Sequence, residues 1–152
     1  MVQTFSIPSE VITKFLGTVF LNADRVAVVS PWVSDITIRF PNSDRVSQRK
    51  MLFSEAVTQL DVDVEIFVDP NQDHHNRQKH TSLLPKISGR VPITEVEDLH
   101  AKAVVTDQVL YQGSANITYN GLNVNIELCD IRENEHGDVN RFLNRRLGIG
   151  TK

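Results

Sequence analysis

The hydrophobic positions along the chain change their spacing several times, which is typical of a protein that alternates helices with strands. Residues 9–21 carry apolar side chains at helical spacing, and Ser9 can cap that helix. The short β-branched run 25–29 predicts a strand covered on both faces, and the segment 62–68, which alternates and then turns apolar, predicts a second strand. Similar reasoning predicts helices over 42–60, 82–87 and 137–147, and extended segments or strands over 36–42, 91–96, 99–106, 109–112 and 123–128. This alternation indicates an α/β domain.

The segment 123–128 shows the cleanest alternation in the chain. If it is a strand, Val124, Ile126 and Leu128 share one face, which we expect to lie against the core. Asn123, Asn125 and Glu127 would then share the polar face.

The predicted strand 99–106 carries the candidate chemistry. Leu99, Ala101, Ala103 and Val105 would point into apolar packing, while His100 and Lys102 would point together to the other side. An imidazole beside an ammonium group on a rigid element can attack and hold a phosphate. A plainer interpretation is that both polar residues face solvent on a half-buried strand.

Composition and charge narrow the possibilities. The 152 residues predict a single domain, residues 1–152, and 40% hydrophobic residues are enough for one core. Cys129 is the only cysteine, which excludes an intrachain disulfide and a cysteine-based zinc site. No secretory signal or membrane-spanning run is visible, so we expect a cytoplasmic protein without a membrane partner.

The net charge of −3 argues against a polycation that coats nucleic acid, but basic stretches remain. Residues 74–90 contain cations and histidines and no acid, and residues 36–50 contain four cations against Asp44 alone. Arg77 and Lys79, in the polar loop 69–80, are candidate substrate-binding residues. A metal site built from that loop is the less favoured alternative, because its acid and histidines match no familiar zinc spacing: Asp73, His74, His75 and His80.

Trp32 follows the predicted strand 25–29, at the end of a strand where ligands bind in open α/β sheets. The indole could serve as a stacking wall for a substrate, or it could brace a loop from within the core. The second interpretation is favoured.

Residues 100–116 spell H-x-K-x4-D-x5-G-S-x-N, which resembles the signature of the phospholipase D superfamily. The resemblance is close over residues 99–128, and elsewhere it extends only to the succession of strands and helices. It implies an α/β fold with a mixed, mostly parallel central sheet flanked by helices on both faces. Only one copy of the motif is present, so each chain would hold half of a site.

Cleavage of a phosphodiester without a metal needs a nucleophile, charge at the non-bridging oxygens and an acid for the leaving oxygen. The neutral imidazole of His100 suits the first role, and Lys102 supplies fixed charge. Ser114 and Asn116 offer neutral donors, and Gly113 lets the backbone approach closely. This chemistry requires no cofactor and no metal.

The resemblance adds specific roles. It implies that His100 forms a covalent phosphohistidine and that Lys102 and Asn116 bind phosphate with support from Ser114. Glu127 resembles the acid that orients the nucleophilic histidine, on the polar side of its strand. Asp107 would be more structural than catalytic, tying the turn after the strand.

A chain with one motif is expected to complete its site by forming a symmetric homodimer, in which two copies of His100 face each other. The leading hypothesis is a metal-independent nuclease acting on DNA or RNA, with recognition supplied by another domain or subunit if it is sequence-specific. One alternative is a phospholipase D-type lipid phosphodiesterase. Another is a non-catalytic nucleic-acid-binding or assembly domain with the same fold.

Overall fold

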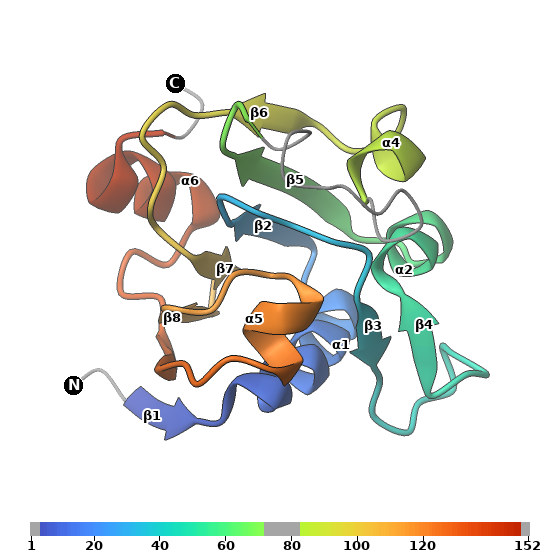
Figure 1. The fold of residues 1–152 in the computed structure, drawn as a ribbon. Helices are drawn as coiled ribbons and strands as arrows, with labels where there is room; N and C mark the ends of the chain where they lie inside the picture. The colour runs from blue at the N-terminus through green and yellow to red at the C-terminus, as the bar shows by residue number, and fades with distance from the viewer. Residues whose placement is uncertain (1–3, 72–82, 150–152) are drawn as a thin grey trace.

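A seven-stranded mixed sheet lies at the centre of the molecule, in the order β1-β9-β8-β7-β2-β5-β6 (Figure 1). The computed structural model describes residues 4–71 and 83–149. The strands of this sheet are β1 (Thr4–Ile7), β2 (Arg25–Val29), β5 (Asp63–Val68), β6 (Ile93–Glu95), β7 (Ala103–Val105), β8 (Val109–Gly113) and β9 (Cys129–Glu133). A separate two-stranded sheet pairs β3 (Thr37–Arg39) with β4 (Lys50–Leu52).

The strand directions confirm the predicted mixed sheet. Strands β1, β8, β2, β5 and β6 run in one direction, and β7 and β9 run in the other. Hydrogen-bonded parallel neighbours are therefore confined to β2, β5 and β6, and every pairing that involves β7 or β9 is antiparallel.

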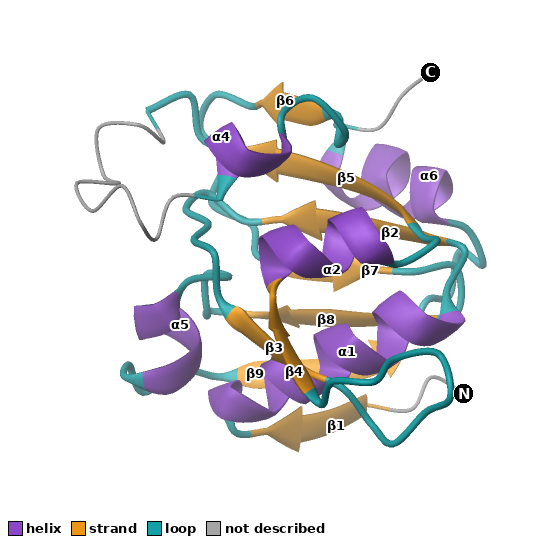
Figure 2. Ribbon diagram, turned by 90° about the vertical axis from the view of Figure 1, so that its right-hand side faces the viewer, coloured by secondary structure: helices purple, strands orange, loops and turns teal. Residues whose placement is uncertain are grey.

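Helices lie on both faces of this sheet, as predicted. Figure 2 shows α1 (Ile12–Asn22) and α2 (Phe53–Gln59) across one face and α6 (Val139–Phe142) on the other. The chain enters α1 through a 3-10 turn, Ser9–Val11, and α6 continues into a π-helical turn, Leu143–Leu147. Two shorter helices, α4 (Leu84–Ile87) and α5 (Tyr119–Asn123), complete the described part. None of the described helices is both long and apolar enough to cross a membrane.

Strand β2 shows why the sheet is buried on both faces. Val26 and Val28 pack into the cluster that contains α1, whereas Ala27 and Val29 pack into the cluster that contains α6. All four side chains are completely buried. A continuous apolar run is what such a doubly covered strand requires.

The predicted helix over 42–60 is too long, because only Phe53–Gln59 is helical. Residues 50–52 form β4, and Met51 lies opposite Ile38 of β3 in the antiparallel pair. Met51 and Ile38 are both buried, so pairing with β3 outweighs the helical spacing of the upstream apolar positions.

The predicted strand 123–128 is wrong. Helix α5 ends at Asn123, and the chain from Val124 to Leu128 forms no strand. Thr118 caps this helix, since its hydroxyl accepts a hydrogen bond from the Gly121 N–H at 3.0 Å. The strand that pairs with β8 begins at Cys129 instead. The three apolar side chains assigned to the core, those of Val124, Ile126 and Leu128, are exposed.

Candidate functional site

The antiparallel pairing of β7 with β8 gathers the motif at one end of the sheet. Ala103 lies opposite Gln112, so the residues before β7 and those after β8 share that end. The Gly113 N–H extends the pairing by donating to the Lys102 carbonyl at 3.3 Å. Strand β2 ends there too, because Val29 lies opposite Ala103. The fold thus brings the His100–Lys102 segment, the Gly113–Asn116 segment and the end of β2 together.

His100 and Lys102 lie just before β7, which is shorter than the predicted strand 99–106. The expected apolar face is nevertheless present, since Leu99, Ala103 and Val105 pack in the cluster that contains α6. The His100 side chain is exposed and makes no hydrogen bond to any described residue. The Lys102 ammonium donates to the His100 carbonyl at 2.9 Å. The imidazole is therefore open to solvent at the end of the sheet.

Ser114 connects the motif to the segment that carries Glu127. Its hydroxyl donates to Glu127 Oε1 at 3.1 Å and accepts from the Leu128 N–H at 2.9 Å. The Ser114 N–H donates to the Leu128 carbonyl, also at 2.9 Å. Glu127 lies on a loop and not on a strand as expected, and its contact with Ser114 places its carboxylate beside the motif.

Gly113 is required by the chain's own backbone. A Cβ atom at this position would lie 2.2 Å from the Leu128 carbonyl oxygen. The backbone that comes close to Gly113 is therefore that of Leu128, at the end of the 124–128 segment. Contact between Gly113 and a substrate stays a prediction.

Tyr111 holds the loop between Ser114 and Asn116, a role that the sequence did not indicate. Its hydroxyl donates to the Ala115 carbonyl at 2.9 Å and accepts from the Ala115 N–H at 3.0 Å. Both residues are completely buried. Burial raises the pKa of the Tyr111 phenol well above its ordinary value, so the hydroxyl keeps its proton and can donate.

Asn116 lies beside Ser30, which follows β2. The buried Ser30 hydroxyl is 2.6 Å from the Trp32 carbonyl and 3.3 Å from Asn116 Oδ1, and it accepts from the Ile117 N–H at 2.9 Å. The hydroxyl has one proton, and the shorter distance favours donation to Trp32. Ser30 thereby fixes the backbone on both sides of the site. The Trp32 side chain is half-buried, which leaves both interpretations of this residue open.

Asp107 lies at the opposite end of β7 from His100. Its Oδ1 accepts from the Val139 N–H at 2.8 Å, at the start of α6. The turn after β7 is held by Thr106, whose hydroxyl accepts from the Gln108 and Val109 N–H groups at 3.3 and 3.0 Å. These contacts fit the structural role that the resemblance implies for Asp107.

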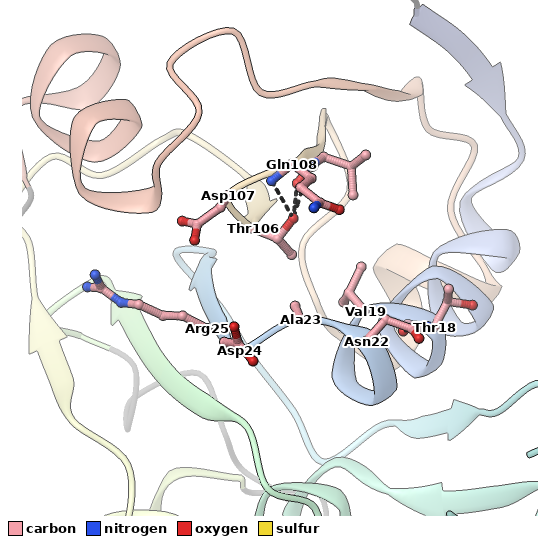
Figure 3. A pocket seen from close by; sticks show the side chains of 10 residues that line it. Thr18, Val19, Asn22, Ala23, Asp24, Arg25, Thr106, Asp107 and Gln108 are labelled. Atoms are coloured by element: carbon pink, nitrogen blue, oxygen red, sulfur yellow. Dashed lines mark hydrogen bonds between the residues drawn. The ribbon is translucent and has the colours of Figure 1, made fainter. Parts of the chain in front are cut away.

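A pocket of about 270 Å³ lies at that same opposite end. Figure 3 shows Asp107 and Gln108 on one side of it and Asn22 of α1 on another. It contains none of the other residues of the motif, so it is not part of the candidate site.

A different cavity, of about 280 Å³, adjoins the motif. Lys102 and Gly113 line it, together with Asp130 of β9 and Arg146 from the turn after α6. Arg146 lies far from the motif in sequence, and only the packing of α6 against the sheet brings it here. Two cations and one carboxylate thus line the cavity at the motif, and the excess of positive charge suits an anionic group.

The basic stretches contribute less to this end of the sheet than their composition suggests. Arg45 donates to the Leu21 carbonyl, and Arg49 donates to the Phe40 carbonyl at 3.1 Å. Lys86 pairs with the buried carboxylate of Asp35 at 2.9 Å. Two sets of residues from the polar loop lie outside the described residues. They are the candidate substrate-binding residues Arg77 and Lys79, and the residues of the less favoured metal site, Asp73, His74, His75 and His80. Within residues 4–71 and 83–149, no three acid, histidine or cysteine side chains gather as a metal site would require.

Comparison with known proteins agrees with this geometry. The family described as "Cardiolipin synthase, PLD-like domain" matches residues 36–145. The chain therefore belongs to the phospholipase D-like family, and no curated protein sequence matches it.

Among solved structures, NucT from Helicobacter pylori superposes with a TM-score of 0.58 at 14% identity, covering 88% of this chain and 86% of that one. Nuc from Salmonella typhimurium, described as a phospholipase D family member, gives 0.54 at 15% identity, with 88% and 83% covered. Polyphosphate kinase from Porphyromonas gingivalis gives a TM-score of 0.58 at 12% identity, and the match covers 100% of this chain and only 26% of the kinase. These likenesses show the shared fold.

Proposed function

We propose that the protein is a metal-independent phosphodiesterase that cleaves DNA or RNA through a covalent phosphohistidine, at a site completed by a second copy of the chain. The observation that carries this proposal is the gathering of His100, Lys102, Ser114 and Asn116 at one end of the sheet by the β7–β8 pairing. The similarity to NucT and Nuc supports nucleic acid as the substrate.

The first chemical step is attack by an imidazole nitrogen of His100 on the phosphorus. The N–P bond forms as the bond to the leaving oxygen breaks, and that oxygen takes a proton from the imidazolium of His100 of the partner subunit. Lys102 and Asn116 stabilise the charge on the non-bridging oxygens. Exposure of the His100 imidazole leaves room for in-line approach of the substrate.

The second step releases the product. Water attacks the phosphorus, the N–P bond breaks, and the partner's His100 accepts the proton from the water. His100 leaves as a neutral imidazole, ready for the next turnover. Glu127 orients His100 in this scheme. Its hydrogen bond to Ser114 holds the carboxylate at the motif until substrate binds.

A phospholipid is the second candidate substrate. Two observations favour it: the matching family is described as a cardiolipin synthase, and exposed apolar side chains lie at Val124, Ile126 and Leu128. The phosphoryl chemistry would be the same, and only the group attached to the phosphate would differ.

The test is hydrolysis of labelled single-stranded DNA, duplex DNA, RNA and phosphatidylcholine in EDTA. We expect cleavage of nucleic acid by the wild type and by His136→Ala, since His136 lies outside the motif on the turn before α6. His100→Ala should lose it by at least about 1000-fold, because the covalent route is removed. Release of choline without nucleic-acid cleavage would favour the phospholipid. Cleavage that needs added metal would contradict the mechanism.

A further inference from the structure

Apolar side chains cluster on the surface directly beside the motif. Five large hydrophobic side chains of the described residues are exposed, and four of them lie between residues 119 and 128. Ile126 is fully exposed, Leu128 is 83% exposed, and Tyr119 and Val124 are about 60% exposed. We call these four residues, with the segment that carries them, the 119–128 surface. A concentration of apolar area of this kind marks an interaction site.

This surface is rigidly connected to the candidate site. The Leu128 N–H donates to the Ser114 hydroxyl, the Leu128 carbonyl accepts from the Ser114 N–H, and the neighbouring Glu127 accepts from the Ser114 hydroxyl. Gly121 of α5 packs against the Asn116 backbone so closely that a Cβ atom would lie 2.2 Å from the Asn116 carbonyl oxygen. Figure 2 shows α5 next to the end of β8. A molecule that covers the 119–128 surface therefore also borders the motif.

The charge pattern indicates which kind of molecule covers the 119–128 surface. Residues 116–129 contain no lysine or arginine, and their only charged residue, Glu127, is half-buried and accepts from the Ser114 hydroxyl. Surfaces that bind anionic membranes or nucleic acid are rich in cations. The polar residues here are exposed asparagines, Asn120, Asn123 and Asn125.

A surface that exposes apolar side chains and asparagines, with a single charged residue, is compatible with a copy of itself. In a twofold dimer the same patch faces its own copy, so a charged patch would repel itself, whereas amide groups both donate and accept. Apolar side chains with few charged residues are also the usual composition of the core of such an interface. Charge and position thus favour a second copy over a lipid surface.

We propose that the 119–128 surface docks a second copy of this chain, with the two copies of α5 and of the 124–128 segment facing each other across a twofold axis. This rests on the proposed function, in which two copies share one site. The proposal goes further by assigning the contact to this surface. Ile126 is its most exposed hydrophobic residue, and Asn125 precedes it in the chain.

The test is sedimentation velocity of the full chain, with Ile126→Asp as the variant and Leu52→Asp as the matched control. Ile126 is fully exposed, so the substitution leaves the core intact, and Leu52 is the exposed hydrophobic residue outside the surface. We expect the wild type and Leu52→Asp to sediment as dimers of the 17.2 kDa chain. Ile126→Asp should raise the dissociation constant at least tenfold. A dimer unchanged by Ile126→Asp, or a wild type that is monomeric, would overturn the proposal.

Two further measurements separate the alternatives. Asn125→Cys should form an intermolecular disulfide under mild oxidation, while Asn42→Cys, on the exposed loop between β3 and β4, should not. Equal cross-linking of both variants would count against this interface. Flotation with vesicles of phosphatidylcholine and phosphatidylglycerol tests the membrane: binding by a monomeric wild type, lost in Ile126→Asp, would replace the dimer by a lipid surface.

The outcomes also separate this proposal from the proposed function. If Ile126→Asp dissociates the dimer while the wild type cleaves no phosphodiester, the interface stands and the enzymatic function fails. If the wild type cleaves nucleic acid and Ile126→Asp remains dimeric, the function stands and the interface is overturned.

Discussion

Replacing Tyr111 by phenylalanine removes one oxygen atom and leaves two buried backbone groups without a partner. The hydroxyl serves both the N–H and the carbonyl of Ala115, and neither residue has any exposed surface. A buried polar group that loses its partner costs about 1–3 kcal/mol. With two such groups, we expect the free energy of unfolding to fall by about 2–4 kcal/mol.

Urea unfolding followed by circular dichroism measures this change, and the denaturant slope should stay the same. The melting temperature should fall by about 5–15 °C for a domain of this size. Thr58 of α2 is exposed and offers a control that also removes one hydroxyl, and Thr58→Val should change stability by less than about 0.5 kcal/mol.

Tyr111→Phe should also reduce turnover, because Ala115 stands between Ser114 and Asn116. A displacement of these donors by a fraction of an ångström should lower kcat by about tenfold or more at temperatures where the variant is folded. A loss of stability below about 0.5 kcal/mol, equal to that of Thr58→Val, would refute the reasoning.

Three other changes probe separate parts of the structure. Asp107→Ala should lower the free energy of unfolding by about 1 kcal/mol, because the Val139 N–H loses its acceptor, and Asp107→Asn should recover most of it in the same urea titration. Burial raises the pKa of both Tyr111 and Cys129, so the native state holds these protons more tightly than the unfolded chain does. The ordinary pKa is 10.0 for the Tyr111 phenol and 9.0 for the Cys129 thiol, and below these values the stabilisation by each bound proton is complete. As the pH rises above each value, the free energy of unfolding falls by up to about 1.4 kcal/mol per pH unit for each group. The decline of the free energy of unfolding with pH should be shallower in Tyr111→Phe than in the wild type. Parallel curves for variant and wild type would count against a role of the Tyr111 proton. Arg146→Ala should raise KM about 3- to 10-fold in steady-state assays because a cation is lost from the cavity beside Lys102, while Arg141→Ala should not.

The sequence predicts well where its pattern has one physical explanation. The run 25–29 is continuously apolar and β-branched, and β2 occupies Arg25–Val29 with both faces covered. Leu99, Ala103 and Val105 pack on one side as their alternation predicts. The motif residues after β8 are adjacent in sequence, so a single strand pairing brings them to the His100 segment.

The segment 123–128 shows where pattern reasoning fails. Its alternation fits a half-buried strand, and the same alternation occurs on an exposed segment whose apolar side chains are free to contact another molecule. What decides between them is the partner of β8, which is taken by Cys129–Glu133. That choice depends on contacts distant in sequence, and no local pattern contains it.

The supporting residues of the site were missed for a related reason. Ser30 reaches Ile117 across 87 positions of sequence, and Arg146 reaches the Lys102 cavity only through the packing of α6. Tyr111 has the hydrophobic character of any core residue in a strand. Nothing in its neighbourhood along the chain distinguishes a hydroxyl that holds a loop from one that faces water.

The covalent intermediate offers the most direct test of the central claim. Wild-type protein mixed with a short oligonucleotide in EDTA, quenched in alkali within milliseconds and measured by intact mass spectrometry, should carry a nucleotide adduct. The adduct should map to His100, survive alkali and be lost in acid, as a phosphoramidate is. It should be absent in His100→Ala and present in His136→Ala. Rapid cleavage by the wild type with no adduct at His100, or cleavage retained in His100→Ala, would contradict the account.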